Sequence, residues 1–562
     1  MSFALSAGVT GLQAHQKMLD IAGNNLANVN TTAFKSSRIT FGELLSETIK
    51  KASQPTTSTG GTNPQQMGSG VGVAGISPNM AQGNIVNTGN PLDMAIEGEG
   101  YFVLNNGSQN VYTRSGVFAV DAASNLVDPA TGCLVQRIGS EGVSDGFQTA
   151  DNSNIHVPYD VAMAAKETTE ISIVGNLSAD SQLPAIQTNV LKSNVPYTTN
   201  NGTTATEATL INDLDRTTPG NYVGATITVT GYKHDGTDLA DVPVPVPPLA
   251  VDATTTMQDL LDHINTVLGA TNAVATLGHG QITITDVDSG YSKSDIKLAF
   301  ANDGEADWTE PSYFEIATVG GEEVKSINIM AFDTQGGKHV LSGAFVRTDA
   351  ANTWDLVLTS ITGDIYDIAV DNRRIKDISF DASDGSYAGL SGSDDAKLVI
   401  TFSHDTANPQ TITVNMGTAG QLNGLTQFAG NSTAVAREQD GYEAGSLANI
   451  SVDNEGTLIG VFSNGIKKNI AAIQIALFQN TSALESIGNG YFNSSANSGG
   501  AVATQAMTGG AGSIHGGALE KSNADVATEF VNMIQAQNGF QANARTITVA
   551  NDILKELTNL IR

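Results

Sequence analysis

The stretch at residues 526–561 decides the fold, and it reads VATEFVNMIQAQNGFQANARTITVANDILKELTNLI. An apolar residue stands at every seventh position of it: Val526, Met533, Phe540, Ile547, Leu554 and Ile561. The other end of the chain has the same spacing, at Leu5, Leu12, Leu19 and Leu26. A strict seven-residue apolar repeat is the seam of a helix that packs against another helix in a supercoil. The two repeats therefore predict terminal helices that meet, in a protein that packs against copies of itself.

The first terminal helix is predicted over residues 2–28, with Ser2 as its cap. The second begins near Ser522, where Ser522 and Asp525 have the spacing of a capping box, and runs close to the end of the sequence. Gly23-Asn24-Asn25 lowers the helix propensity of the first one. We therefore expect neither helix to be stable without a packed partner.

Between the ends, the composition is typical of β-rich domains. The 562 residues include 59 glycines but only 2 tryptophans, and short runs rich in Val, Ile and Thr recur from about residue 76 to about residue 460. A chain of this length exceeds one ordinary core, so we expect three or more domains. The predicted fold class is a mainly β multidomain body with paired, coiled-coil-like α-helical termini.

One predicted helix interrupts the strands, at residues 256–268. Thr256 and Asp259 have the spacing of a capping box, and Gly269 stands where a helix stop belongs. A proline-rich run at 242–248 precedes it. We interpret residues 185–320 as an inserted outer domain with an α/β-like element and a core of its own, which could be deleted without loss of the assembly.

The net charge of −30 lies almost entirely between the two ends. Residues 1–51 carry five basic and three acidic side chains, and residues 519–562 carry four and five. A nucleic-acid surface would be basic, so this class of partner is excluded. The sequence has no run of roughly 18 apolar residues that could span a bilayer, and its start lacks the pattern of a signal peptide.

No motif predicts an enzyme, a metal site or a cofactor. Cys133 is the only cysteine, so an intramolecular disulfide is impossible, and its context favours a small buried residue. Gly70-Val-Gly-Val-Ala-Gly75 matches a dinucleotide fingerprint, but neither a strand precedes it nor a helix follows it. The histidines and carboxylates form no pair that indicates catalysis.

The polar face of the C-terminal helix is rich in uncharged amides. It includes Gln535, Asn538, Gln541 and Arg545. A surface helix usually carries Glu and Lys, so amides favour a wet channel wall, and a plain solvent-facing surface remains the alternative.

Four ordered blocks of this sequence are similar to those of the bacterial flagellar rod and hook proteins. Gly11-Leu-Gln-Ala-His-Gln-Lys-Met-Leu-Asp-Ile-Ala-Gly-Asn-Asn-Leu-Ala-Asn-Val-Asn-Thr-Thr-Ala-Phe-Lys35 resembles the family's N-terminal signature, with Ala33 in place of the usual glycine. Leu519-Glu-Lys-Ser-Asn-Ala-Asp525 and Phe530-Val-Asn-Met-Ile534 resemble its C-terminal signature. Blocks at 88–118 and 441–465 resemble the two halves of its β-rich shell domain, and 327–339 resembles an outer domain of hook members.

The resemblance implies a structural protein, not an enzyme, that polymerises into the curved, flexible tube between the basal-body rod and the filament. Its implied partners are copies of itself, the rod, hook-cap and hook–filament junction proteins, and the flagellar export apparatus, through which it would leave the cell. The repeat residues would be the assembly interface and the amide face would line the channel. A distal rod protein of the same family and a secreted β-rich adhesin or glycan-active enzyme are the alternatives.

The resemblance and the patterns together predict eight segments. They are a terminal helix (1–34), a flexible connector (35–74), the first half of the shell domain (75–160), the start of an outer β domain (161–184), an additional outer domain (185–320), the remainder of the outer β domain (321–435), the second half of the shell domain (436–520) and the C-terminal helix (521–562).

Overall fold

The structure is a computed structural model, and it describes residues 3–180, 187–218, 220–241, 246–392 and 396–560. Contacts within the chain divide it into two units. Unit 1 comprises Met1–Met163 and Gly445–Arg562, and unit 2 comprises Ala164–Ala444. Strands dominate the described residues of both units, and the two terminal helices pair, which confirms the predicted fold class.

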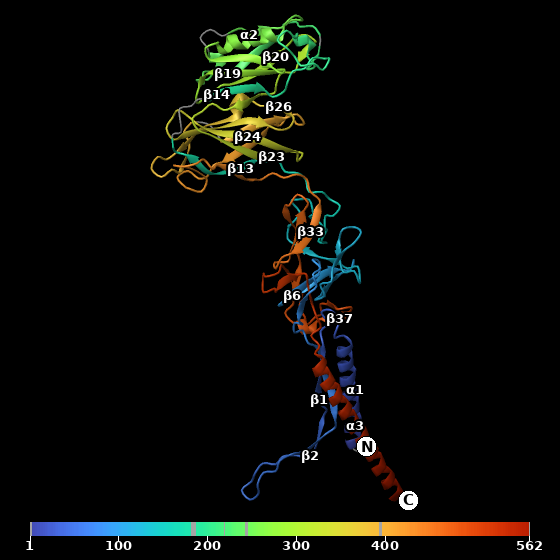
Figure 1. The fold of residues 1–562 in the computed structure, drawn as a ribbon. Coiled ribbons are helices and arrows are strands. Elements are labelled where there is room, and N and C mark those ends of the chain that lie inside the picture. The colour runs from blue at the N-terminus through green and yellow to red at the C-terminus, as the bar shows by residue number, and fades with distance from the viewer. Residues whose placement is uncertain (1–2, 181–186, 219, 242–245, 393–395, 561–562) are drawn as a thin grey trace. The chain divides into compact units, whose positions relative to one another are not determined.

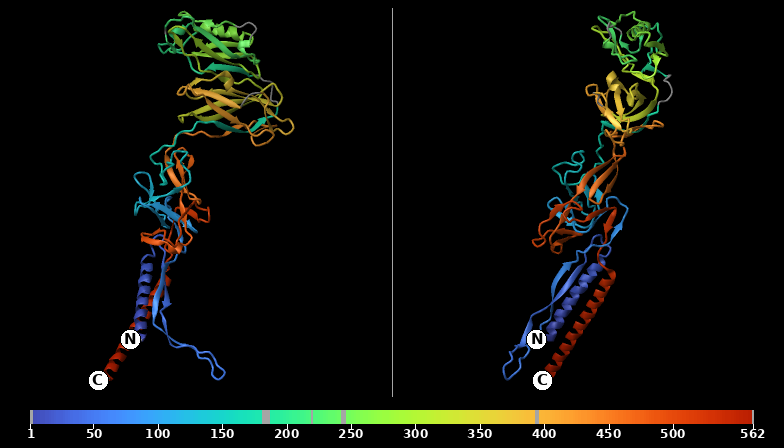
Figure 2. Two further views of the ribbon diagram at one scale, coloured as in Figure 1. Left: turned by 180° about the vertical axis from the view of Figure 1, so that it is seen from behind. Right: turned by 90° about the vertical axis from the view of Figure 1, so that its left-hand side faces the viewer.

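The terminal helices α1 (Phe3–Ala27) and α3 (Val526–Leu560) lie side by side in unit 1 (Figures 1 and 2). The predicted cap Ser2 and the predicted seam residue Ile561 lie outside the described residues. The start of α3 corrects the sequence prediction, because Asp525 and not Ser522 caps it. The Asp525 carboxylate accepts a hydrogen bond from the Thr528 N–H at 3.0 Å, whereas the Ser522 hydroxyl accepts from the Ala524 N–H, before the helix begins.

Residues 35–74, predicted to be a flexible connector, contain three strands and the beginning of a fourth. They form two antiparallel pairs: β1 (Ser37–Glu43) with β4 (Val71–Pro78), and β2 (Ser46–Lys50) with β3 (Gln65–Gly68). The β1–β4 ladder packs against α1. The composition of this segment alone predicts no strand. In the structure each strand is stabilised by pairing with its partner, and β1 and β4 also by packing against α1. The flexibility of this segment stays a prediction.

The β body of unit 1 combines two stretches of chain that are far apart in sequence. The first supplies β5 (Ile85–Asn87), β6 (Met94–Glu97), β7 (Tyr101–Asn105), β8 (Asn110–Thr113), β9 (Ala119–Val120), β10 (Leu126–Val127), β11 (Leu134–Val135) and β12 (Arg137–Ile138). The second supplies β33 (Leu447–Val452), β34 (Thr457–Phe462), β35 (Lys467–Ile473), β36 (Ile475–Leu477), β37 (Glu485–Gly488), β38 (Tyr491–Asn493), β39 (Val502–Thr504), β40 (Ser513–Gly516) and β41 (Ala518–Glu520). Strands of the two stretches pair directly, as β7 does with β36 and β8 with β38. Neither stretch forms these sheets without the other.

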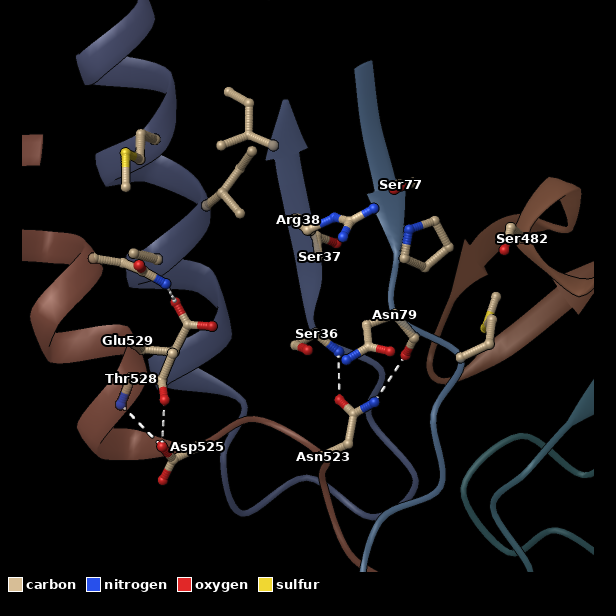
Figure 3. A pocket seen from close by; sticks show the side chains of 17 residues that line it. Ser36, Ser37, Arg38, Ser77, Asn79, Ser482, Asn523, Asp525, Thr528 and Glu529 are labelled. Carbon is tan, nitrogen blue, oxygen red and sulfur yellow. Dashed lines mark hydrogen bonds between the residues drawn. The ribbon is translucent and has the colours of Figure 1, made fainter. Parts of the chain in front are cut away.

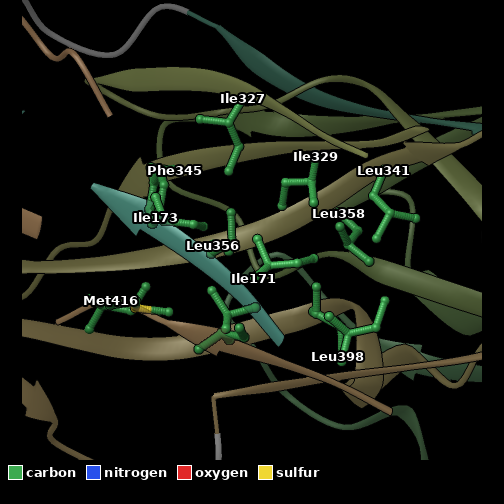
Figure 4. Packing of buried hydrophobic residues seen from close by; sticks show 14 of the residues in the cluster. Ile171, Ile173, Ile327, Ile329, Leu341, Phe345, Leu356, Leu358, Leu398 and Met416 are labelled. Atoms are coloured by element: carbon green, nitrogen blue, oxygen red, sulfur yellow. The ribbon is translucent and has the colours of Figure 1, made fainter. Parts of the chain in front are cut away.

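Unit 2 contains a core between two sheets. One sheet has the order β23-β24-β25-β27-β28, and the other has the order β26-β29-β30-β13-β31, with β32 beside β13. Alternate residues of each strand point into the core, such as Ile171 and Ile173 of β13 and Ile327 and Ile329 of β23 (Figure 4). The strands are β13 (Glu170–Ser178), β23 (Val324–Phe332), β24 (Lys338–Arg347), β25 (Thr353–Ile361), β26 (Ile365–Asp367), β27 (Arg374–Phe380), β28 (Tyr387–Leu390), β29 (Lys397–Phe402), β30 (Gln410–Asn415), β31 (Leu425–Phe428) and β32 (Val435–Gln439).

A second core in unit 2 is organised around α2 (Met257–Leu268), which confirms the helix predicted there. Both hydrogen bonds of the capping box between Thr256 and Asp259 are present, and Gly269 ends the helix with a φ of 82°. The accompanying strands are β14 (Thr188–Ser193), β15 (Thr217–Thr218), β16 (Thr226–Tyr232), β17 (Leu249–Ala250), β18 (Ala273–Gly278), β19 (Gln281–Ser289), β20 (Asp295–Ala301), β21 (Asp307–Trp308) and β22 (Phe314–Thr318). The proline-rich run lies partly outside the described residues.

Almost all buried residues of this second core lie within residues 185–320, and two from outside the segment complete it. That residues 185–320 are a separate domain stays a prediction. Val346 of β24 and Val357 of β25 belong to the α2 cluster. The buried Arg373 guanidinium reaches into the same segment, where its Nε donates to Asp295 Oδ2 at 3.0 Å and its Nη1 donates to the Phe314 carbonyl. The chain pattern showed capped and strand-like elements but could not show which residues outside the segment complete their packing.

Candidate assembly interface

α1 and α3 run antiparallel and approach each other through small residues. Gly11 lies against Asn543, and a methyl group at Gly11 would lie 2.8 Å from the Asn543 side chain. Gly539 lies against His15, and a methyl group there would lie 2.4 Å from the imidazole ring. Buried alanines fill the rest of the contact: Ala14, Ala22 and Ala536. The close approach therefore depends on positions without large side chains.

The predicted seam residues flank this contact. Six of them are half-buried: Leu5, Leu12, Leu19, Leu26, Met533 and Ile547. Val526, Phe540 and Leu554 are exposed, at 40 %, 38 % and 45 %. A straight helix of 3.6 residues per turn drifts relative to a seven-residue repeat, so one stripe cannot stay in one contact along all of α3. Within one chain the tight contact is the glycine and alanine stripe, and burial of the heptad residues between subunits stays a prediction.

α3 also continues past the start of α1. Residues 551–559 are all exposed, although Ile553, Leu554 and Leu557 are among them. A helix turn with several bare leucine and isoleucine side chains is unusual for a helix that serves only as a surface element. This end of α3 therefore offers an apolar surface that its own chain leaves uncovered.

The strands beside α1 expose apolar side chains as well. Phe41, Val73 and Ile76 on the β1–β4 ladder are 40–54 % exposed, although the Phe41 ring lies 6.2 Å from the His15 ring of α1. At the start of the β2–β3 arm, Leu45 is 88 % exposed. The uncovered apolar surface thus extends from the helices onto the strands.

The predicted channel-facing residues Gln535, Asn538, Gln541 and Arg545 are all exposed. Asn538, Gln541 and Arg545 share one side of α3, where they line a shallow groove together with Ala4 of α1. This side is separate from the glycine and alanine stripe. Whether it faces a channel is not tested by one chain, and it stays a prediction.

A junction of buried hydrogen bonds fixes the helix pair to the strands. Asn25, 1 % exposed, donates from Nδ2 to Glu529 Oε1 and to the Ser37 carbonyl, both at 2.9 Å. The Ser37 N–H donates back to Asn25 Oδ1 at 2.9 Å. One amide therefore joins α1, β1 and α3, and the buried acceptors and donors satisfy one another.

Asn523, just before α3, makes the second connection of this junction. The Ser36 N–H donates to Asn523 Oδ1 at 2.8 Å, and Asn523 Nδ2 donates to the carbonyls of Asn79 and Ala81 (Figure 3). The side chain thus holds the segments that lead into β1 and out of β4 next to the beginning of α3.

A buried ion pair between Lys35 and Glu520 lies next to this junction. Lys35 Nζ is 2.7 Å from Glu520 Oε1 and also donates to the Ala81 carbonyl, and the Gly83 N–H donates to the same carboxylate oxygen. Burial lowers the pKa of Lys35, and the Glu520 carboxylate partly offsets this effect. Arg114 Nη1 lies 3.7 Å from the other oxygen of the same carboxylate, so loss of Glu520 would leave two buried cations without their counter-charge.

A cavity of about 690 Å³ opens beside the junction, and Met18, Ile21 and Ile39 line it together with mostly polar side chains (Figure 3). Its carboxylates already have structural partners: Glu529 binds Asn25, and hydrogen bonds from Thr528 hold the pKa of Asp525 below its ordinary value. These contacts cap and position α3, and the lining contains no arrangement typical of catalysis.

The junction residues Asn25, Lys35, Glu520, Asn523 and Glu529 were not assigned a role from the sequence. One signal was available. Gly11, Ala14, Met18, Ala22 and Asn25 recur with spacings of three and four, which is a small-residue helix face that ends in a polar residue. An amide at the end of such a face indicates a buried hydrogen bond across the contact.

Within 3–180, 187–218, 220–241, 246–392 and 396–560, no group of three or more His, Cys, Asp or Glu side chains is placed to hold a metal ion. In the same part of the chain, no helix combines the length and apolar character needed to cross a bilayer.

Four family models match this chain in order. They are described as "Flagella basal body rod protein" (residues 5–35), "Flagellar hook protein FlgE/F/G D1 domain" (95–179), "Flagellar basal body protein FlaE D2 domain" (310–442) and "Flagellar basal body rod FlgEFG protein C-terminal" (515–560). The first and last matches cover most of α1 and α3 together with the junction residues. Most of the α2 core lies between the second and third matches.

Curated relatives match over their whole length. The chain is 29 % identical to the flagellar hook protein FlgE of Borreliella burgdorferi and 29 % identical to that of Treponema pallidum, with 100 % of each chain covered. It is 27 % identical to the FlgE of Escherichia coli, with 99 % of this chain and 100 % of the relative covered. These matches span the terminal helices, both halves of the β body and unit 2. The chain belongs to the flagellar hook protein family and has its structural role in the flagellum.

Proposed function

We propose that copies of this chain polymerise into the curved, flexible tube that joins the basal-body rod to the filament and transmits torque. The terminal helices form the inner wall of this tube, and β-rich domains stack outside it. In this role the chain binds and bends but catalyses no reaction. Its partners are other copies, the rod, cap and hook–filament junction proteins at the two ends, and the flagellar export apparatus, which carries it out of the cell.

One observation carries the proposal: α1 and α3 satisfy each other through small residues and leave their large apolar residues uncovered. Val9, Phe530, Val531, Ile534 and Ile553 are each more than 40 % exposed, in addition to the seam residues Phe540 and Leu554. Contiguous exposed apolar surface of this kind marks a protein–protein interface. Because it extends along both helices and onto the β1–β4 ladder, contacts with several neighbouring copies can cover it.

The polar face of α3 fits the same arrangement. If the apolar sides of the helices pack against neighbours, Asn538, Gln541 and Arg545 remain on the side that stays wet. Amides bind water without a strong field of either sign, which suits the wall of a channel that unfolded chains must traverse. The polar side of α3 is therefore expected to face the channel if the tube forms as proposed.

The test is Leu12→Asp, with Gln13→Asp as the matched control. Leu12 is a half-buried seam residue and Gln13 is its exposed neighbour on the same helix. Burying an unpaired carboxylate between subunits costs several kcal/mol, whereas an exposed carboxylate costs little. We expect the purified Leu12→Asp protein to remain monomeric under conditions in which the wild type and Gln13→Asp form tubes visible by electron microscopy.

Both tryptophans of the chain, Trp308 and Trp354, are buried in unit 2, so their fluorescence verifies that the variants are folded there. Tubes of normal length from folded Leu12→Asp protein would contradict the seam assignment. Failure of the wild type itself to polymerise alone would contradict the proposal that the chain is the tube's subunit.

A further inference from the structure

Unit 2 is strongly acidic, but several of its basic residues gather at one place. Residues 164–444 contain thirty-seven aspartates and glutamates and only fourteen lysines and arginines. Three of these cations line one cavity of about 130 Å³: Lys293, just before β20, and Arg374 and Lys376 of β27. The cavity thus lies where the strands around α2 meet the sheet that contains β27.

Arg374 is buried and fixed in the wall of this cavity. It is 8 % exposed, its Nη1 donates to Asp355 Oδ2 at 3.1 Å, and its Nη2 donates to the Ser292 carbonyl at 3.0 Å. The Asp355 carboxylate also accepts hydrogen bonds from the Tyr291 hydroxyl and the Asp377 N–H. Because a guanidinium has five N–H groups, Arg374 keeps donors for a further acceptor.

The two carboxylates in the cavity wall each have a cation as partner. Lys376 Nζ donates to Asp371 Oδ1 at 3.1 Å, and the Tyr232 hydroxyl donates to the same oxygen at 2.8 Å. Asp295 is bound by Arg373, whose Nε donates to its Oδ2 at 3.0 Å. Neither carboxylate is therefore left to balance a further positive charge.

Lys293 is that further positive charge. Among the residues that the structure describes, its ammonium meets no carboxylate and lies 5.9 Å from the centroid of the Tyr291 ring. Its stem packs against Gly236, where a methyl group would lie 2.6 Å from Lys293 Cδ. The cations at this cavity thus exceed the carboxylates that pair with them by one, within a unit whose net charge is strongly negative.

A concave wall with an unbalanced cation attracts anions and raises their local concentration. Guanidinium and ammonium groups form their strongest hydrogen bonds with carboxylate and phosphate oxygens, and the planar N–H groups of arginine match the geometry of such oxygens. A cavity of this volume holds several water molecules, and so it has room for one group of that size.

We propose that this cavity is an oxyanion site, in which a carboxylate or phosphate group binds Lys293, Arg374 and Lys376 together. The bound group ties the chain before β20 to β27 and thereby stabilises unit 2. It is either a free ion or the acidic side chain of a second copy, whose unit 2 carries the same excess of carboxylates. The three cations belong to one chain, so the site does not depend on polymerisation.

The first test uses inorganic phosphate as the probe and the full-length monomer as the protein. Unfolding of unit 2 in urea is followed by the fluorescence of Trp308 and Trp354, while phosphate replaces chloride at constant ionic strength. A ligand that binds only the folded state shifts the equilibrium by the factor one plus its concentration divided by Kd. We therefore expect the folding equilibrium constant to rise about tenfold at a phosphate concentration of about ten times Kd.

Two variants separate binding from the general stabilising effect of phosphate on folded proteins. Lys293→Gln removes an exposed ammonium without disturbing the buried pairs, and its response should fall to that general effect. Lys338→Gln removes an exposed lysine of β24 outside the cavity, and it should keep the wild-type response.

The second test distinguishes the two sources of the oxyanion in assembled tubes. If a carboxylate of a second copy occupies the site, phosphate competes with it, and wild-type tubes dissociate at a lower urea concentration as phosphate is added. If the site holds a free ion, phosphate does not weaken the tubes. Wild-type monomers that gain no more from phosphate than Lys293→Gln, together with tubes of the two proteins that respond alike, would overturn the proposal.

Discussion

The helix pair and unit 2 differ in which apolar side chains they bury. In unit 2 the largest side chains are inside: Trp308, Trp354, Phe314 and Phe345 are at most 1 % exposed. In α1 and α3 the buried positions are glycines and alanines together with the junction residues Asn25 and Glu529, while several large apolar side chains are exposed: Val9, Phe530, Val531, Ile534 and Phe540. Large apolar side chains in the interior are typical of a domain that is stable on its own, as in unit 2. Large apolar side chains on the surface are typical of an element that packs against other subunits, as in the helix pair.

The difference shows where assembly is encoded. Unit 2 derives its stability from its own two cores and from the buried ion pair of Arg373 with Asp295 between them, so we expect it to fold before any contact with a second copy. The two helices contact each other closely but over a small area, and a polar junction fixes them to the strands. Most of the apolar side chains of the helices can therefore be buried only by other subunits.

The largest effect is expected from deleting residues 185–320. Because Val346 and Val357 complete the α2 core and Arg373 binds Asp295, the deletion exposes apolar surface and leaves a buried guanidinium unpaired. We expect the remainder of unit 2 to unfold, with the Trp354 emission shifted to that of a solvated indole. Removal of residues 551–562 from α3 is the control, and it leaves the tryptophan emission unchanged. A folded deletion variant would show that the shared core is dispensable.

The next effect concerns the buried pair itself. Asp295→Ala leaves Arg373 without its carboxylate, and breaking a buried ion pair from one side costs about 3–5 kcal/mol. The free energy of unfolding of unit 2, measured in urea by tryptophan fluorescence, should fall by that amount. The double variant Asp295→Leu with Arg373→Met should recover most of it, because no charge is left unpaired. Equal losses in the single and double variants would mean that packing, not charge, holds this contact.

A smaller effect is expected in the helix seam. Gly539→Ala places a methyl group 2.4 Å from the His15 ring, so this ring or the helices must shift, at a cost of about 1–3 kcal/mol if the ring stays packed. Assembled tubes of this variant should dissociate at a lower urea concentration than the wild type, with unit 2 unchanged.

Gly23→Ala is the matched control for the seam, because nothing lies within 4 Å of the added methyl group. It should stabilise α1 by about 1 kcal/mol through helix propensity alone. If both variants shift dissociation in the same direction, the glycines matter for backbone flexibility and not for close approach.

The smallest effect is a pH dependence at Asp440. Partial burial opposes its ionisation, but hydrogen bonds from Lys166, Thr169 and the Glu170 N–H outweigh this and hold the pKa of the Asp440 carboxyl well below its usual range. A carboxyl whose pKa is lowered by folding contributes stability above its unfolded-state pKa, roughly 3.9, and that contribution is lost as the pH falls further.

The urea midpoint of unit 2 should therefore decrease more steeply below about pH 4 in the wild type than in Asp440→Asn. Asp349→Asn, which changes an exposed carboxylate of the same unit, should keep the wild-type slope. Identical slopes in all three proteins would show that the Asp440 hydrogen bonds are absent in solution.

Local patterns in the sequence were sufficient for part of this structure. The α2 helix is visible in its capping box and apolar face, and the terminal helices are visible in their repeats, because both signals depend on neighbours in sequence. The sequence pattern misplaced the start of α3, because Ser522 and Asp525 are both good caps and only the backbone decides between them. It also missed the strands at 35–74, whose order comes from pairing with segments up to 41 positions away, as Ser37 pairs with Pro78.

The interface shows the same limit. A seven-residue repeat identified the helices and their apolar side chains, but not which stripe packs within the chain. That choice depends on Gly11 and Gly539, whose contribution is the absence of a side chain. The junction formed by Asn25, Asn523 and Glu529 was equally invisible, because the partners of Asn25 lie up to 504 positions away.

We infer that the helix pair is completed only by other subunits, whereas unit 2 is complete alone. Hydrogen exchange of the same protein as a verified monomer and as assembled tubes tests it most directly. We predict that amides of α1 and α3 exchange quickly in the monomer and become strongly protected in tubes, while amides of β23–β25 are equally protected in both. Helix amides in the monomer that are already as protected as those of unit 2, with no gain on assembly, would contradict the account.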